Sequence, residues 1–128
     1  MRLLFSRCAG YTVDSVSIVA DVSERPLKAW SVNGYRVRPP VDSVRLFDTP
    51  RGWREDERSL TALSEGVPYE ARSMGTVDHR ALNGQIRFTV GQVRELERDD
   101  VLVSDGGDKT KVMDRSDFLA AGSECGLG

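Results

Sequence analysis

The side chains of this chain that are best suited to binding a ligand are its arginines, which outnumber its lysines 15 to 3. A guanidinium presents a rigid fork of donors that matches the oxygens of a carboxylate or a phosphate. G+C-rich codons are a sufficient explanation of the ratio, so the positions of the arginines matter more than their number. The candidate ligand-binding residues are six arginines and two aromatic residues: Arg36, Arg38, Arg45, Arg54, Arg80, Arg87, Phe47 and Trp53.

Patterns for catalysis and for metal binding are weak in this sequence. His79 is the single histidine, and its place on an apolar strand face favours a packed core residue over a general base. Cys8 and Cys125 have neither CxxC spacing nor a recognisable base beside them. The aspartates between residues 99 and 108 lack the spacing of a calcium loop, which favours a turn and a solvated acidic edge. We therefore predict no catalytic residue, no metal site and no cofactor.

Charge is distributed unevenly along the chain, although the formal net charge is only −2. Residues 25–54 contain seven basic and two acidic residues, a net charge of +5. Residues 95–117 contain eight acidic and four basic residues, a net charge of −4. The basic part could attract an anion, and the acidic part could form the surface for a protein partner.

Two Asn-Gly pairs predict the elements that position the arginines. Asn-Gly between alternating apolar runs is typical of a two-residue type I′ hairpin turn. A turn at Asn33-Gly34 places Arg36 and Arg38 on the face opposite the core. The predicted core face of this hairpin consists of its apolar residues: Trp30, Val32, Tyr35 and Val37.

The second pair, Asn83-Gly84, predicts a hairpin in which Arg80 lies directly opposite Arg87. Like charges at such a position destabilise a sheet by roughly a few tenths of a kcal/mol or more. A bound phosphate would relieve this repulsion. The alternative is an ordinary solvated sheet face, whose arginines pair with Glu70, with Asp78 or with the acidic C-terminal half.

The remaining patterns predict short strands and helices. Residues 3–5 and 11–22 are expected to be strands, the second with a bulge near Ser15. Residues 41–48 are ambiguous between a strand and a helical turn, and residues 49–52 predict a turn. Further predictions are a helix over about 53–65, a short helix over 92–98, a hairpin of 101–104 with 110–113, and a helix over 115–121 capped by Asp114.

These elements predict an α+β fold, a mainly antiparallel sheet built from β-hairpins with two or three short helices. We expect a single small domain over residues 1–122, followed by a flexible tail over 123–128. Among the aromatic residues, Trp30, Tyr35 and Phe88 fall on predicted core faces. Phe47 and Trp53 lie in irregular segments beside arginines, where exposed rings could stack on bases.

The sequence thus favours a non-catalytic binding protein that recognises a phosphate-bearing ligand, either a nucleotide or a nucleic-acid backbone. The alternative is a protein–protein module that inhibits a host factor, and in type the chain resembles small accessory proteins of phages and mobile elements. A small hydrolase is a third hypothesis. The two lone cysteines and a first apolar run too short for a signal peptide predict a cytoplasmic protein without a membrane partner. A homo-oligomer is compatible with the sequence.

Overall fold

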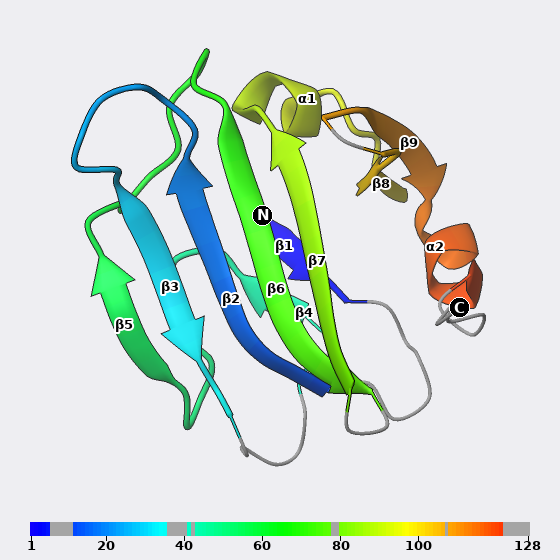
Figure 1. Ribbon diagram of the computed structural model, residues 1–128. Coiled ribbons are helices and arrows are strands. Elements are labelled where there is room, and N and C mark those ends of the chain that lie inside the picture. The colour runs from blue at the N-terminus through cyan, green and yellow to red at the C-terminus, as the bar shows by residue number, and fades with distance from the viewer. Residues whose placement is uncertain (6–11, 36–40, 42, 78–79, 107, 122–128) are drawn as a thin grey trace.

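The largest element of the fold is a five-stranded antiparallel sheet with the strand order β5-β3-β2-β6-β7 (Figure 1). The computed structural model describes residues 1–5, 12–35, 41, 43–77, 80–106 and 108–121. The strands of this sheet are β2 Thr12–Ala20, β3 Ala29–Asn33, β5 Arg54–Arg58, β6 Tyr69–Val77 and β7 Arg80–Phe88.

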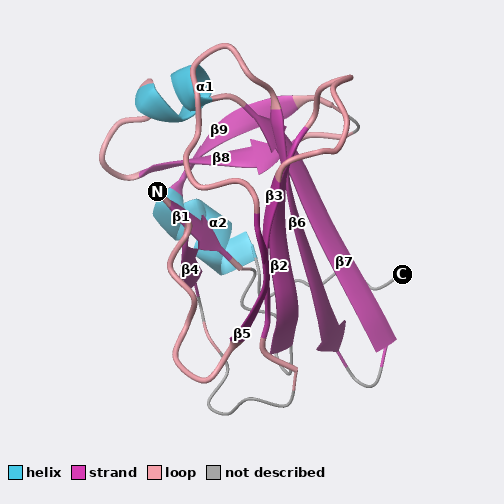
Figure 2. Ribbon diagram, turned by 90° about the vertical axis from the view of Figure 1, so that its left-hand side faces the viewer, coloured by secondary structure: helices cyan, strands magenta, loops and turns pink. Residues whose placement is uncertain are grey.

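The remaining elements form a second layer, which lies on one side of the large sheet (Figure 2). This layer consists of two short strand pairs and two helices: β1 Arg2–Leu4 with β4 Ser43–Arg45, β8 Asp100–Ser104 with β9 Thr110–Asp114, α1 Val90–Arg94 and α2 Arg115–Ala121. The predicted α+β class, with antiparallel sheets and two short helices, is confirmed. Among the described residues, no helix is long and apolar enough to cross a membrane.

The hydrophobic core lies between the two layers and begins with β2. The inward side chains of this strand change parity because a β-bulge separates Val13 from Ser15, as the sequence pattern predicts. The large sheet contributes most of the buried apolar side chains: Val13, Val16, Ile18, Ala20, Trp30, Val32, Tyr69, Ala71 and Phe88. The second layer and its loops add Phe5, Val44 and Leu46. The other face of the sheet carries the alternate, more polar residues of the same strands.

The predicted hairpin at Asn33-Gly34 is wrong. β3 is hydrogen-bonded to β2 on one edge and to β5 on the other, so it has no free edge for a hairpin partner. The Gly34 N–H donates to the Asp14 carbonyl at 2.8 Å, and Tyr35 is 59% exposed instead of buried. Long-range pairing with two other strands replaces the local turn that the dipeptide predicts.

The predicted turn at Asn83-Gly84 is also wrong, although β6 and β7 do form a hairpin. Asn83 and Gly84 lie inside β7, opposite Met74 and Ser73, and the connection falls at residues 78–79, outside the described residues. This register gives nine cross-strand pairs along β6. A turn at residues 83–84 would leave nearly all of β6 without that partner, and its backbone groups would need other hydrogen bonds.

The predicted helix over residues 53–65 is wrong as well. Residues Arg54–Arg58 form β5, an edge strand whose five side chains are all exposed. Leu60 is buried, and its N–H donates to the Ala29 carbonyl at 2.9 Å, which extends the attachment to β3. β5 shows no apolar alternation because an edge strand needs only its backbone to join the sheet. The preceding turn is confirmed by the bond from the Trp53 N–H to the Pro50 carbonyl.

The local predictions in the C-terminal third are confirmed, except for the bounds of the first helix. A short helix does occur, but α1 covers Val90–Arg94 instead of 92–98, because a capping box between Thr89 and Gln92 starts it earlier. The hairpin flanking residues 105–108 is β8–β9. Asp114 caps α2, since its Oδ1 accepts from the Ser116 N–H at 2.8 Å.

The Asp114 cap gives a pH-dependent prediction for α2. The Ser116 hydroxyl and then the Ser116 backbone N–H, both donating to the carboxylate, lower the pKa of Asp114 below its ordinary 3.8. A depressed pKa means that the cap stabilises α2 above pH 3.8 and that this stabilisation is lost as the pH falls through the folded pKa. We expect Asp114→Ala to reduce the helical Cα chemical shifts of residues 116–120 at neutral pH, as acid does in the wild type.

Asp114→Asn is the matched control, because asparagine keeps the acceptor oxygen without a titrating proton. Its α2 shifts should remain helical across the acid range. Acid-induced fraying that is equal in the asparagine variant and in the wild type would contradict the role of the Asp114 carboxylate.

Candidate functional site

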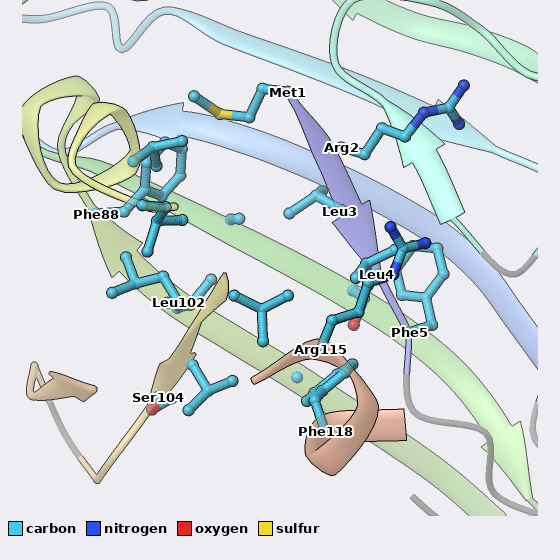
Figure 3. Close-up of a pocket in the computed structure, with 18 of the residues that line it drawn as sticks. Met1, Arg2, Leu3, Leu4, Phe5, Phe88, Leu102, Ser104, Arg115 and Phe118 are labelled. Atoms are coloured by element: carbon cyan, nitrogen blue, oxygen red, sulfur yellow. The ribbon is translucent and has the colours of Figure 1, made fainter. Parts of the chain in front are cut away.

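A cavity of about 550 Å³ lies between the large sheet and the second layer (Figure 3). The sheet side of this cavity is formed by β6 and β7, and the opposite side by β1, β8 and α2. α1 and the residues after it, including Val93 and Leu96, close one end. Most of the lining side chains are apolar.

Small residues on the covered face of β6 and β7 create the space. Ser73 lies directly opposite Gly84, and the neighbouring inward pair is Ala71 with Ile86. Gly84 therefore has no side chain to fill the space above the sheet, and a Cβ at this position would meet only the Ser73 hydroxyl, at 3.0 Å. The cavity is therefore deeper over Ser73 and Gly84 than over the Tyr69–Phe88 pair, whose side chains are large.

The opposite wall is built from residues of three elements. Leu3 and Phe5 come from β1 and its end, Leu102 from β8 and Phe118 from α2. In Figure 3 these side chains surround the open space, and Phe88 closes the far end. Since the elements are distant in sequence, the wall exists only when the second layer is packed onto the sheet.

Within the described part of the chain, five residues with charged side chains line the cavity: Arg2, Arg72, Arg98, Arg115 and Asp100. Arg2 donates to the Ser43 hydroxyl at 3.2 Å, and Arg72 is ion-paired with Glu70 at 2.7 Å on the outer face of β6. The Asp100 carboxylate accepts from the Glu97 N–H at 3.1 Å. The ion pairs among the described residues involve neither Arg98 nor Arg115.

The arginines predicted to converge on the hairpin faces are not brought together as expected. The pairing of Arg80 with Arg87 is wrong, since the backbone of Arg80 pairs with Val77 and Arg87 lies opposite Glu70. The Arg87 side chain is ion-paired with Asp21 at 3.2 Å and with Asp108 at 3.4 Å. The electrostatic conflict that a phosphate would relieve is therefore absent. Arg36 and Arg38 lie outside the described residues.

The candidate residues between 45 and 54 also differ from expectation. Trp53 is only 9% exposed, and Phe47 is half-buried with its ring edge-on to Trp30 at 5.7 Å. The expectation of exposed aromatic platforms is wrong because this loop folds back onto β3. Arg54 is exposed and paired with Asp56 at 2.7 Å, and Arg45 is exposed on β4.

The residues that line the cavity were not predicted as site residues. The sequence could have indicated two of them. Arg98 and Arg115 flank the correctly predicted β8–β9 hairpin and therefore lie at its open end. Two aspartates of that region form ion pairs, Asp105 with Lys111 at 3.6 Å and Asp108 with Arg87. Within the described ranges, no group of three or more potential metal ligands occurs.

Comparisons with protein-family models, with curated proteins and with solved structures find no match for this chain.

Proposed function

We propose that this protein is a non-catalytic binding protein that holds a small, largely apolar molecule in the cavity between its two layers. The observation that supports this function is the cavity itself, at about 550 Å³. Pockets for small ligands have volumes of roughly 300–1,000 Å³ and apolar linings with a few polar groups.

The packing of the fold supports a ligand at this position. The cavity is partly open to solvent, so without a ligand its apolar lining is exposed to water and lacks the dispersion contacts of a packed interior. Ile86 and Leu102 contribute apolar lining from opposite walls. An apolar molecule between them would restore these contacts and would leave water at the same time.

The ligand classes predicted from the sequence have less support than the cavity. A nucleotide or a nucleic-acid backbone was expected to bind arginines on the sheet face, and Arg87 there is already paired with two carboxylates. The inhibition of a host factor through the acidic half stays a prediction. The cavity offers a site whose occupant can be tested directly.

The test uses Nile red, an uncharged dye whose fluorescence rises in apolar surroundings. We expect saturable binding of one dye per chain and displacement by dodecanol. Ser73→Trp should weaken dye binding by at least about tenfold, because the indole would occupy the floor of the cavity. Leu102→Trp should do the same from the opposite wall.

Met74→Trp is the matched control, since Met74 follows Ser73 on β6 but points to the other face and is 54% exposed. Its affinity for the dye should equal that of the wild type, and circular dichroism should show the same fold in all three variants. The absence of saturable dye binding to the wild type would contradict the proposed function. An equal loss in the Met74 variant would contradict the assignment to this cavity.

A further inference from the structure

The charged lining of the cavity has a strong excess of positive charge. Among the described residues, four arginines and one aspartate line it. Arg2 and Arg72 have polar partners away from the cavity, in Ser43 and Glu70. Among the lining arginines that the structure describes, Arg98 and Arg115 are the two whose guanidinium groups form neither an ion pair nor a hydrogen bond with another described residue.

The β8–β9 hairpin brings the backbone segments that carry Arg98 and Arg115 close together. Asp100, the first residue of β8, pairs with Asp114, the last residue of β9. Arg98 precedes this pair closely in sequence and Arg115 follows it directly, so both leave the open end of the hairpin. The Arg115 N–H donates to the carbonyl of Asp99 at 2.7 Å, which fixes the two backbone segments side by side.

The direction of the Arg115 side chain supports a role at the cavity. In Figure 3 it extends from the start of α2 toward β1, and Arg115 lines the same cavity as Leu4 and Phe5. Arg115 is an exposed residue that also lines the apolar cavity. Asp100, the single lining carboxylate, is held by the Glu97 N–H at 3.1 Å and forms no ion pair with either arginine among the described residues.

We infer that the ligand of this cavity is an amphipathic acid, whose carboxylate or phosphate group is bound by Arg115 and Arg98. This inference rests on the proposed function, because it requires the apolar part of the ligand to lie over Ser73 and Gly84. Guanidinium groups form charge-assisted, often bidentate hydrogen bonds with both kinds of acid. An alcohol of the same chain length lacks that charge, and an ammonium group would be repelled.

The experiment compares ligands that share one alkyl chain and differ in the head group. Dodecanoate, dodecyl phosphate, dodecanol and dodecyltrimethylammonium would each be titrated by calorimetry below their micelle concentrations. We expect at least one of the two anions to bind about tenfold or more tightly than the alcohol, and the ammonium compound to bind most weakly. The tighter of the two anions identifies the acid as a carboxylate or a phosphate.

Two variants assign the preference to the arginines. In Arg115→Gln and in Arg98→Gln, the preference for the anion over dodecanol should fall toward parity, while the affinity for dodecanol stays unchanged. Arg94→Gln is the control, since Arg94 lies in α1, is ion-paired with Glu65 and does not line the cavity. It should retain the full preference.

The outcomes separate the inference from the proposed function. If dodecanol and both anions bound the wild type equally, the inference of an acidic ligand would be wrong, and the proposed apolar site would remain supported. No binding of any compound would overturn both. An anion preference that persists in the double variant Arg98→Gln/Arg115→Gln would overturn the assignment to these arginines.

Discussion

Replacement of Gly34 by alanine is expected to destabilise the protein by about 3 kcal/mol, at the upper end of the usual cost of overpacking a core. The Cβ of alanine would lie 2.0 Å from Cε2 of Trp53, a distance at which the ring or the strand must move. Trp53 is buried against β3 and has little room to yield. The positive-φ glycines in the described residues are Gly52, Gly66 and Gly106, so the cost at Gly34 comes from the contact and not from the backbone angle.

Urea unfolding followed by tryptophan fluorescence measures this effect. A double-mutant cycle with Trp53→Leu tests its cause, because a smaller side chain at residue 53 should recover much of the loss. Gly84→Ala is the matched control from the other Asn-Gly pair, since its Cβ would meet only the rotatable Ser73 hydroxyl at 3.0 Å. We expect a change within about 1 kcal/mol there, because alanine also removes the entropic cost of glycine in a strand. Equal losses at Gly34 and Gly84 would contradict the contact with Trp53.

Replacement of Trp30 by alanine is expected to cost about 3–5 kcal/mol, the usual range for removing a large aromatic side chain from a core. Trp30 is 0% exposed and lies in β3, between β2 and β5. Its ring packs edge-on against Phe47, which holds a left-handed φ of 64°. Loss of the indole would remove the contact that holds this strained residue against the sheet.

The indole N–H of Trp30 also donates to Oε1 of Glu55 at 3.1 Å and thereby attaches β5 to the core. Trp30→Phe separates the two contributions, because phenylalanine keeps most of the packing but has no donor. We expect it to cost about 1–2 kcal/mol, since Glu55 retains its ion pair with Arg58. If Trp30→Ala and Trp30→Phe had the same free energy of unfolding, packing of the indole would not be the dominant contribution.

The sequence by itself determined the elements whose sequence patterns lie within a few residues of one another along the chain. The parity change in β2 predicted its bulge, and the loop at residues 105–108 predicted the β8–β9 hairpin. Asp114 marked the start of α2 through a bond that closes within two residues. The burial of Trp30 and Phe88 and the α+β class followed from alternation alone. Such features need no knowledge of the neighbouring strands.

The strand connections depended on partners that are distant in sequence. An Asn-Gly pair permits a tight turn but does not require one. β3 instead inserts between β2 and β5, and β7 extends through Asn83 and Gly84 to pair with all of β6. β5 gave no signal, because an exposed edge strand is held by backbone hydrogen bonds that its side chains do not reveal. The predicted pairing of Arg80 with Arg87 therefore failed together with the turn.

The candidate site was decided by the tertiary structure. The cavity requires a register that sets Ser73 opposite Gly84 and a second layer that places Leu102 and Phe118 above them. None of the predicted site residues whose side chains the structure describes lines it. The sequence contained the arginines and the small residues, but the space between two layers arises only when segments far apart in the chain pack together. Their contacts are long-range, so no local pattern encodes the cavity.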